Sequence, residues 1–213
     1  MSIELYDFSN TSFEVKASLY RNDSDSDCKG VCLVFPGAEY SHMGPCLYYP
    51  SKLLLDQGYD ILNFEYNFRQ NGSRKERFPK DEEEAYKEFF DFLMTKINDL
   101  KLPATKIVLA KSLGTRIIAA GNTDIFQKVF WFTPALKDSF VREKISKQGE
   151  KSSIFIGDED FFFDEKVIKG FERSLVKVHV VKNGDNGLEI SNNLIQTIDE
   201  MKNVMNAFQK FLA

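Results

Sequence analysis

The sequence predicts an α/β fold, with a mostly parallel sheet, helices on both faces and an antiparallel hairpin at the N-terminus. Short apolar segments alternate with longer segments of helical periodicity from residue 31 onward. Several of the short segments are continuous apolar runs, which are typical of strands buried on both faces. The chain has 213 residues, a length that suits a single domain spanning residues 1–213 and needs no disulfide or metal for stability.

Each element follows from its residue pattern. Residues 3–8 and 12–20 are β-like and flank a short polar turn, which predicts the hairpin. In the segment 81–100, large apolar residues recur at helical spacing, and acidic residues occupy the first turn. The remaining expected strands are 31–35, 60–66, 106–110, 129–133, 153–156 and 176–181. The remaining expected helices are 48–55, 113–120, 165–173 and 190–211, with one short helix within the polar segment 134–150.

Composition excludes several functional classes. A formal net charge of −4 gives no reason to expect nucleic acid as the main partner. The sequence lacks both a membrane-length apolar run and the features of a signal peptide. An odd number of cysteines, Cys28, Cys32 and Cys46, favours reduced thiols. We therefore expect a cytoplasmic protein that binds a small molecule without a cofactor or metal, in an oligomeric state that the sequence leaves open.

The stretch KIVLAKSLGT, residues 106–115, predicts a strand that turns sharply into a helix, with Ser112 at the corner. Ala110 and Gly114 stand two residues before and after the serine, and small residues there let such a turn close. The turn would raise the serine clear of the sheet and direct the N–H of Leu113 at the same site, as an oxyanion donor. The alternative is a serine that merely caps the helix.

From residue 31 onward the chain resembles the α/β-hydrolase superfamily, and in particular a small bacterial branch with little lid. The resemblance rests on the order of five segments: FPGAEYS (35–41), KSLGT (111–115), FTP (132–134), GDED (157–160) and NGDNGLE (183–189). It implies the α/β-hydrolase fold with a minimal cap and Ser112 as the nucleophile. It also implies a second oxyanion donor in the loop after strand 31–35, from the backbone N–H of Ala38 or of its neighbours Glu39 and Tyr40.

The resemblance also implies where a catalytic acid and base would stand. Asp160 matches the acid, whose role is to orient and stabilise an imidazole, and Asp158 and Asp164 are alternatives in the same loop. The histidine of such hydrolases follows the last strand, and here Asn186 occupies its position. A neutral amide cannot accept a proton near neutral pH, so Asn186 cannot be the general base.

Another side chain would have to replace the missing base. The chain has two histidines. His42 lies in the loop that would cover the site, from which it would approach Ser112 in an unusual direction. His179 lies within an expected strand, where a histidine more often packs in the interior or faces solvent than acts as a catalytic base. Lys111 is adjacent to Ser112, but neighbouring side chains diverge at such a turn.

Two functions remain open. In the first, the protein is a serine hydrolase acting on a small ester-like substrate, with Ser112 as nucleophile, Asp160 as acid, and either His42 or an unidentified group as base. In the second, it is a catalytically impaired protein of hydrolase fold that binds a ligand or partner through the pocket that holds substrate in active hydrolases. The turn at Ser112 supports the first function, and Asn186 supports the second.

Three other features have simpler interpretations. The acidic segment 23–27 begins like a calcium loop, but it lacks the glycine and glutamate that such a loop requires. The basic residues of 69–80 could attract an anion, although a solvated loop is the simpler interpretation. The aromatic residues of 161–163 could line a pocket or belong to the core. The polar segment 134–150 is too short for a large cap, so we expect an open pocket.

Overall fold

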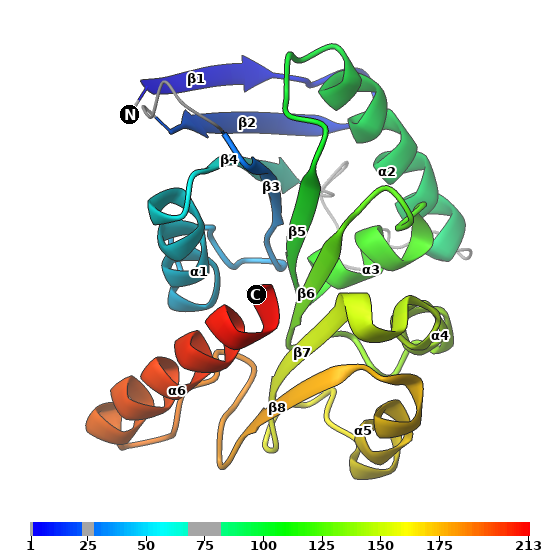
Figure 1. Cartoon of the computed structure of the whole chain (residues 1–213). Helices are drawn as coiled ribbons and strands as arrows, with labels where there is room; N and C mark the ends of the chain where they lie inside the picture. Colours follow the sequence, from blue (N-terminus) through cyan, green and yellow to red (C-terminus); the bar gives the residue numbers. More distant parts are fainter. Residues whose placement is uncertain (1, 23–27, 68–81) are drawn as a thin grey trace.

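The computed structural model describes residues 2–22, 28–67 and 82–213, and within them one eight-stranded sheet has the order β1-β2-β4-β3-β5-β6-β7-β8 (Figure 1). The acidic segment 23–27 and the basic segment 69–80 lie outside the described residues. The strands are β1 Ser2–Asp7, β2 Glu14–Arg21, β3 Gly30–Phe35, β4 Tyr59–Asn67, β5 Lys106–Lys111, β6 Lys128–Phe132, β7 Ser152–Gly157 and β8 Lys177–Val181.

The sheet confirms the predicted fold class. Strands β1 and β2 form the expected antiparallel hairpin, and β2 is antiparallel to β4. The pairs β4-β3, β3-β5, β5-β6, β6-β7 and β7-β8 are all parallel. Strands β3 and β7 are buried along their whole length, which explains their continuous apolar sequences, because both faces of these strands are covered.

Helices cover both faces of the sheet (Figure 1). Helices α1 (Pro45–Asp56) and α6 (Leu194–Leu212) pack on one face. The other face carries α2 (Glu82–Asn98), α3 (Leu113–Ala120), α4 (Ser139–Gln148) and α5 (Glu165–Phe171). Two short 3₁₀ turns, Gly149–Lys151 and Glu172–Ser174, follow α4 and α5. None of the described helices combines the length and apolar character that a bilayer span requires.

Strand β5 shows how the sequence divides its side chains between the two faces. Val108 and Ala110 belong to the core under α2 and α3, whereas Ile107 and Leu109 belong to the core under α1 and α6. Because side chains alternate along a strand, Lys111 follows Ile107 and Leu109 on the second face. It is fully buried there, so the strand ends with a charged group inside the molecule.

Two helix starts differ from the sequence prediction. Helix α1 begins at Pro45, before the expected residue 48, because proline's fixed φ and missing N–H suit the first helical position. Helix α6 begins at Leu194 rather than at residue 190. Asn193 sets this start, since its side-chain Oδ1 accepts a hydrogen bond from the N–H of Gln196 at 3.1 Å. The short helix expected within 134–150 is α4.

Candidate functional site

Ser112 lies at a sharp turn between β5 and α3, with φ 47° and ψ −108°. A positive φ is uncommon for a residue with a side chain and costs on the order of 1–3 kcal/mol. Backbone contacts hold the turn: the N–H of Ser112 donates to the carbonyl of Phe132 at 3.1 Å, and its own carbonyl accepts from the N–H of Thr115 at 3.0 Å. The serine side chain makes no capping hydrogen bond to the helix.

Two glycines let the neighbouring strand and loop approach this turn. A Cβ on Gly114 would lie 2.2 Å from the carbonyl oxygen of Phe35, so only glycine permits α3 to begin against β3. A Cβ on Gly37 would lie 3.2 Å from the Cβ of Ser112. The loop after β3 therefore runs directly beside Ser112. Ala38, the next residue, is exposed to solvent.

Asp160 and Asn186 meet across the loops that follow β7 and β8. The Nδ2 of Asn186 donates to Oδ2 of Asp160 at 3.0 Å, and the N–H of Phe162 donates to Oδ1 at 2.8 Å. Asp160 is only 5% exposed, and this burial raises the pKa of its carboxyl group, against the lowering effect of those two hydrogen bonds and of the Lys111 charge. Both carboxylate oxygens accept hydrogen bonds, as the ionised form requires.

Close backbone approach brings these two loops together. A Cβ on Gly157 would lie 1.8 Å from the carbonyl oxygen of Gly184, and that carbonyl accepts the N–H of Glu159 at 3.0 Å. The other two candidate acids have different partners. Asp158 accepts the N–H of Asn183 at 2.5 Å, and Asp164 caps the start of α5. Of the three candidate acids, the one that meets Asn186 is Asp160.

Lys111 completes the cluster from inside the molecule. Its Nζ donates to Thr133 Oγ1 at 3.0 Å, to the Asn186 carbonyl at 2.8 Å and to Asn186 Oδ1 at 3.0 Å, and it lies 4.3 Å from the centre of the Tyr40 ring. Three acceptors match the three N–H bonds of an ammonium group. Burial lowers the pKa of this lysine, and the charge of Asp160 is among the groups that oppose the shift.

The side chain of Asn186 therefore bridges two buried charges. Its carbonyl oxygen faces the Lys111 ammonium, and its amide nitrogen faces the Asp160 carboxylate. Only this orientation of the amide satisfies both partners. We call the three residues the Lys111–Asn186–Asp160 bridge. Sequence reasoning considered Lys111 only as a base and missed this role, although a lysine that ends an apolar strand is an unusual feature.

Neither histidine lies in this bridge. The Nδ1 of His42 is 3.7 Å from Oε1 of Glu65 on β4, beyond normal hydrogen-bond distance. His179 is on β8, where its ring centre lies 6.1 Å from that of Phe155, and burial lowers its pKa. Within the described residues, no hydrogen bond or ion pair joins either histidine to Ser112.

Backbone strain concentrates on the same edge of the sheet. Six of the seven non-glycine residues with positive φ in the described chain lie in loops after β3, β5, β6 and β8: Glu39, Ser112, Thr133, Asn183, Leu188 and Asn192. Ligands of open parallel sheets bind at the carboxyl ends of the strands, and strained residues are frequent at functional sites. Both observations make this edge the candidate site.

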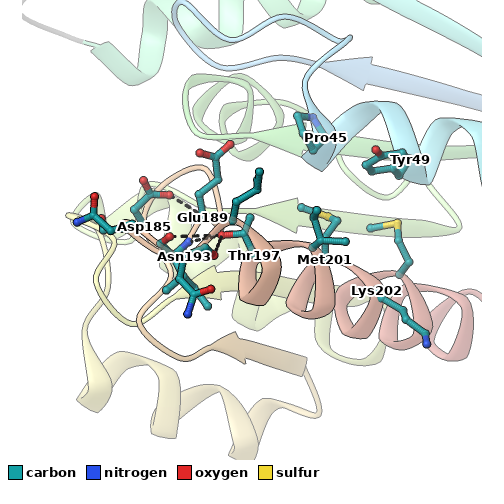
Figure 2. Close-up of a pocket in the computed structure, with 14 residues that line it drawn as sticks. Pro45, Tyr49, Asp185, Glu189, Asn193, Thr197, Met201 and Lys202 are labelled. Atoms are coloured by element: carbon teal, nitrogen blue, oxygen red, sulfur yellow. Dashed lines mark hydrogen bonds between the residues drawn. The ribbon is translucent and has the colours of Figure 1, made fainter.

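Two further features flank the site. Phe161 is 73% exposed, and the Nζ of Lys137 lies 3.0 Å from its ring centre, whereas Phe162 and Phe163 pack against the core. A cavity of about 770 Å³ adjoins the loop that carries Asn186, between α1 and α6 (Figure 2). Pro45, Glu189 and apolar side chains of α6 line it, and Ser112 does not.

Solved structures share this architecture over almost the whole chain. They include a predicted CIB-like hydrolase from Thermoplasma acidophilum (TM-score 0.66, 16% identity, covering 97% of this chain and 99% of that one). Another is a serine hydrolase without a lid from Xanthomonas campestris (TM-score 0.65, 10% identity, covering 99% of this chain and 93% of that one). The chain has the lidless α/β-hydrolase fold. An esterase from Pyrococcus furiosus is similar to a comparable degree (TM-score 0.65, 13% identity, covering 98% of this chain and 92% of that one).

The sequence itself matches no protein-family model and no curated protein. At identities of 10–16%, the structural likeness establishes the fold and leaves the activity to be argued from the site.

Proposed function

We propose that the protein is a serine hydrolase of the esterase type, in which Ser112 attacks a small ester or related acyl substrate and turnover is slow. The observation that carries this proposal is the strained turn at Ser112, with φ 47°, beside the loop after β3. Backbone strain of this kind persists where the surrounding structure enforces it, and here it presents a hydroxyl at the edge of the sheet.

In the proposed reaction, Ser112 Oγ bonds to the substrate carbonyl carbon, and the N–H of Leu113 stabilises the developing oxyanion. The second donor would come from the loop after β3. There the N–H of Tyr40 already donates to the carbonyl of Gly37 at 3.3 Å, so Ala38 is the better candidate. The bond between the carbonyl carbon and the alkoxy oxygen then breaks, and the alcohol leaves with the proton that Ser112 lost, transferred through solvent water. A water molecule next attacks the acyl-serine, which releases the acid and returns a proton to Ser112 Oγ.

Turnover would be slow because, within residues 2–22, 28–67 and 82–213, no candidate base is hydrogen-bonded to the Ser112 hydroxyl. Asn186 occupies the position that faces Asp160, and its amide cannot take up a proton near neutral pH. The Nζ of Lys111 is already engaged by Thr133 Oγ1 and by two oxygens of Asn186, so it is not directed at Ser112. In triad enzymes that lose a member, the oxyanion hole and binding retain a rate roughly 10³–10⁴ above that in water.

The second candidate function is binding of a small ligand or a partner without turnover. The completeness of the Lys111–Asn186–Asp160 bridge favours it. Every polar group of the Asn186 side chain has a partner, and the two buried charges are compensated without a histidine. Position 186 would then serve to hold the loop after β8 in place.

A fluorophosphonate probe, which bonds to activated serines, separates the two candidates. We expect a single adduct on the wild-type protein, formed slowly because Ser112 lacks a base and located at Ser112 by peptide mapping, and no adduct on Ser112→Ala. Ser191→Ala removes an exposed serine from the loop before α6 and serves as the matched control, which should label like wild type. If the wild type is not labelled and hydrolyses p-nitrophenyl acetate no faster than Ser112→Ala, the binding function is correct instead.

A further inference from the structure

A second cavity, of about 180 Å³, lies beneath α1 where the helix crosses β2 and β4. Its wall is mainly apolar and aromatic, and Ser112 is not part of it. An engineered apolar cavity of about 150 Å³ is large enough to bind benzene, so this space suits a single ring with a substituent. Its lining residues come from β2, β4, α1 and the loop before α1: Tyr20, His42, Met43, Tyr48, Ser51, Lys52, Leu55, Ile61 and Asn63.

Three side chains of this wall carry buried polar atoms that have no hydrogen-bond partner in the described part of the chain, although Nδ1 of His42 lies 3.7 Å from Oε1 of Glu65. These atoms are the Nδ1 of His42, the Oγ of Ser51 and the Oδ1 of Asn63. Ser51 is 7% exposed and Asn63 is 5% exposed. An unsatisfied buried polar atom is unfavourable, and native proteins contain few of them. The gathering of three around one cavity therefore needs an explanation.

The surrounding packing does not require these polar residues. Asn63 lies on β4 between the buried Leu62 and Phe64, and Ser51 lies on the buried face of α1. Apolar side chains of similar size would fill both positions without leaving an unpaired group. In ligand sites, a few convergent polar groups fix the ligand in an otherwise apolar pocket.

The three atoms restrict the chemistry of the ligand. The Oδ1 of Asn63 can only accept a hydrogen bond, whereas a hydroxyl and a neutral imidazole nitrogen can donate or accept. The ligand must therefore present a donor, which excludes a carboxylate at this point. The rings of Tyr20 and Tyr48 and the side chains of Leu55 and Ile61 suit a flat apolar body.

We propose that this cavity binds a small neutral aromatic molecule whose hydroxyl or amide group donates to Asn63 and pairs with Ser51. In this proposal, binding requires both side chains to change rotamer, between staggered positions, so that their polar groups face the ligand. The site is separate from the serine chemistry, because Ser112 and Asp160 are not among its lining residues. It would be present whether or not Ser112 is reactive.

Ligand-detected ¹⁹F NMR with 4-fluorophenol tests the proposal, and fluorobenzene, which lacks the hydroxyl, is the matched probe. We expect 4-fluorophenol to bind the wild-type protein at least tenfold more tightly than fluorobenzene. Asn63→Leu should weaken 4-fluorophenol binding at least tenfold and leave fluorobenzene binding unchanged or improved. Ser51→Ala should weaken 4-fluorophenol less, and it keeps the test valid if Asn63→Leu does not fold.

Several results would overturn the proposal. Equal binding of the two probes would show an apolar cavity without recognition. No binding of 4-fluorophenol at millimolar concentration would show that the cavity does not recognise this class of ligand. Ser112→Ala should leave the dissociation constants of 4-fluorophenol and fluorobenzene unchanged. The same variant is expected to abolish fluorophosphonate labelling. The two proposals therefore fail or succeed independently.

Discussion

The Lys111–Asn186–Asp160 bridge makes a quantitative prediction about stability. Two hydrogen bonds of 3.0 Å, joined by an amide whose oxygen and nitrogen are about 2.3 Å apart, place the two charges at most about 8 Å from each other. At an effective dielectric constant of about 20, Coulomb's law gives an attraction of about 2 kcal/mol at this distance. Lys111→Met should destabilise the fold by about 3–5 kcal/mol, because it leaves the buried carboxylate of Asp160 uncompensated.

A double-mutant cycle measures the coupling between the two charges. The variants Lys111→Met, Asp160→Asn and the double variant would be unfolded in urea. The fluorescence of the chain's one tryptophan, the buried Trp131, reports on unfolding. We expect the double variant to lose about 2 kcal/mol less than the sum of the single variants.

The exposed pair Lys87 and Asp91 on α2, joined at 2.6 Å, is the matched control for this cycle. Solvent screens such pairs, so their cycle should show no resolvable coupling. If the cycle of Lys111 and Asp160 shows a coupling no larger than that of the control, the amide does not connect the two charges and the reasoning is wrong.

Three further predictions concern the turn, the acid and a helix start. Gly114→Ala would place a Cβ 2.2 Å from the carbonyl oxygen of Phe35, so we expect the free energy of unfolding in urea to fall by roughly 1–3 kcal/mol. Fluorophosphonate should also label this variant more slowly, and an unchanged labelling rate would contradict the role of Gly114 in the turn. Burial raises the pKa of Asp160 above its value in the unfolded chain, so the folded state takes up the proton first as the pH falls. Protonation of Asp160 therefore adds to the free energy of unfolding as the pH falls toward about 4. Urea unfolding at several pH values should show this increase in the wild-type protein and not in Asp160→Asn. Asn193→Ala removes the cap of α6 and should cost about 1 kcal/mol in thermal unfolding, whereas an unchanged melting temperature would show that the cap is not needed.

Much of the fold could be predicted because its strands are locally encoded. The short apolar run of β3 and the run from Ile107 to Ala110 within β5 favour buried strands, because strands of this length that are covered on both faces are apolar throughout. The ends of the elements were harder to predict. Pro45 starts α1 and Asn193 starts α6, and in both regions several polar residues could have marked the helix boundary.

The site could be predicted only in part. The positions of Ser112, Asp160 and Asn186 in their loops follow from motif order along the chain. The bridge could not be predicted, because it depends on the long side chain of Lys111 crossing to a loop 75 residues away. The contact between His42 and β4 depends in the same way on how the loop before α1 packs.

The histidine variant tests the account most directly. In Asn186→His, the Nδ1–H of the imidazole can donate to Asp160 as the amide nitrogen does at 3.0 Å, and its Nε2 supplies the missing base. We predict that the kcat/KM for p-nitrophenyl acetate rises at least tenfold and that the added substitution Ser112→Ala abolishes the gain. A folded Asn186→His variant that hydrolyses the ester no faster than wild type would contradict the claim that this position limits a preorganised serine site.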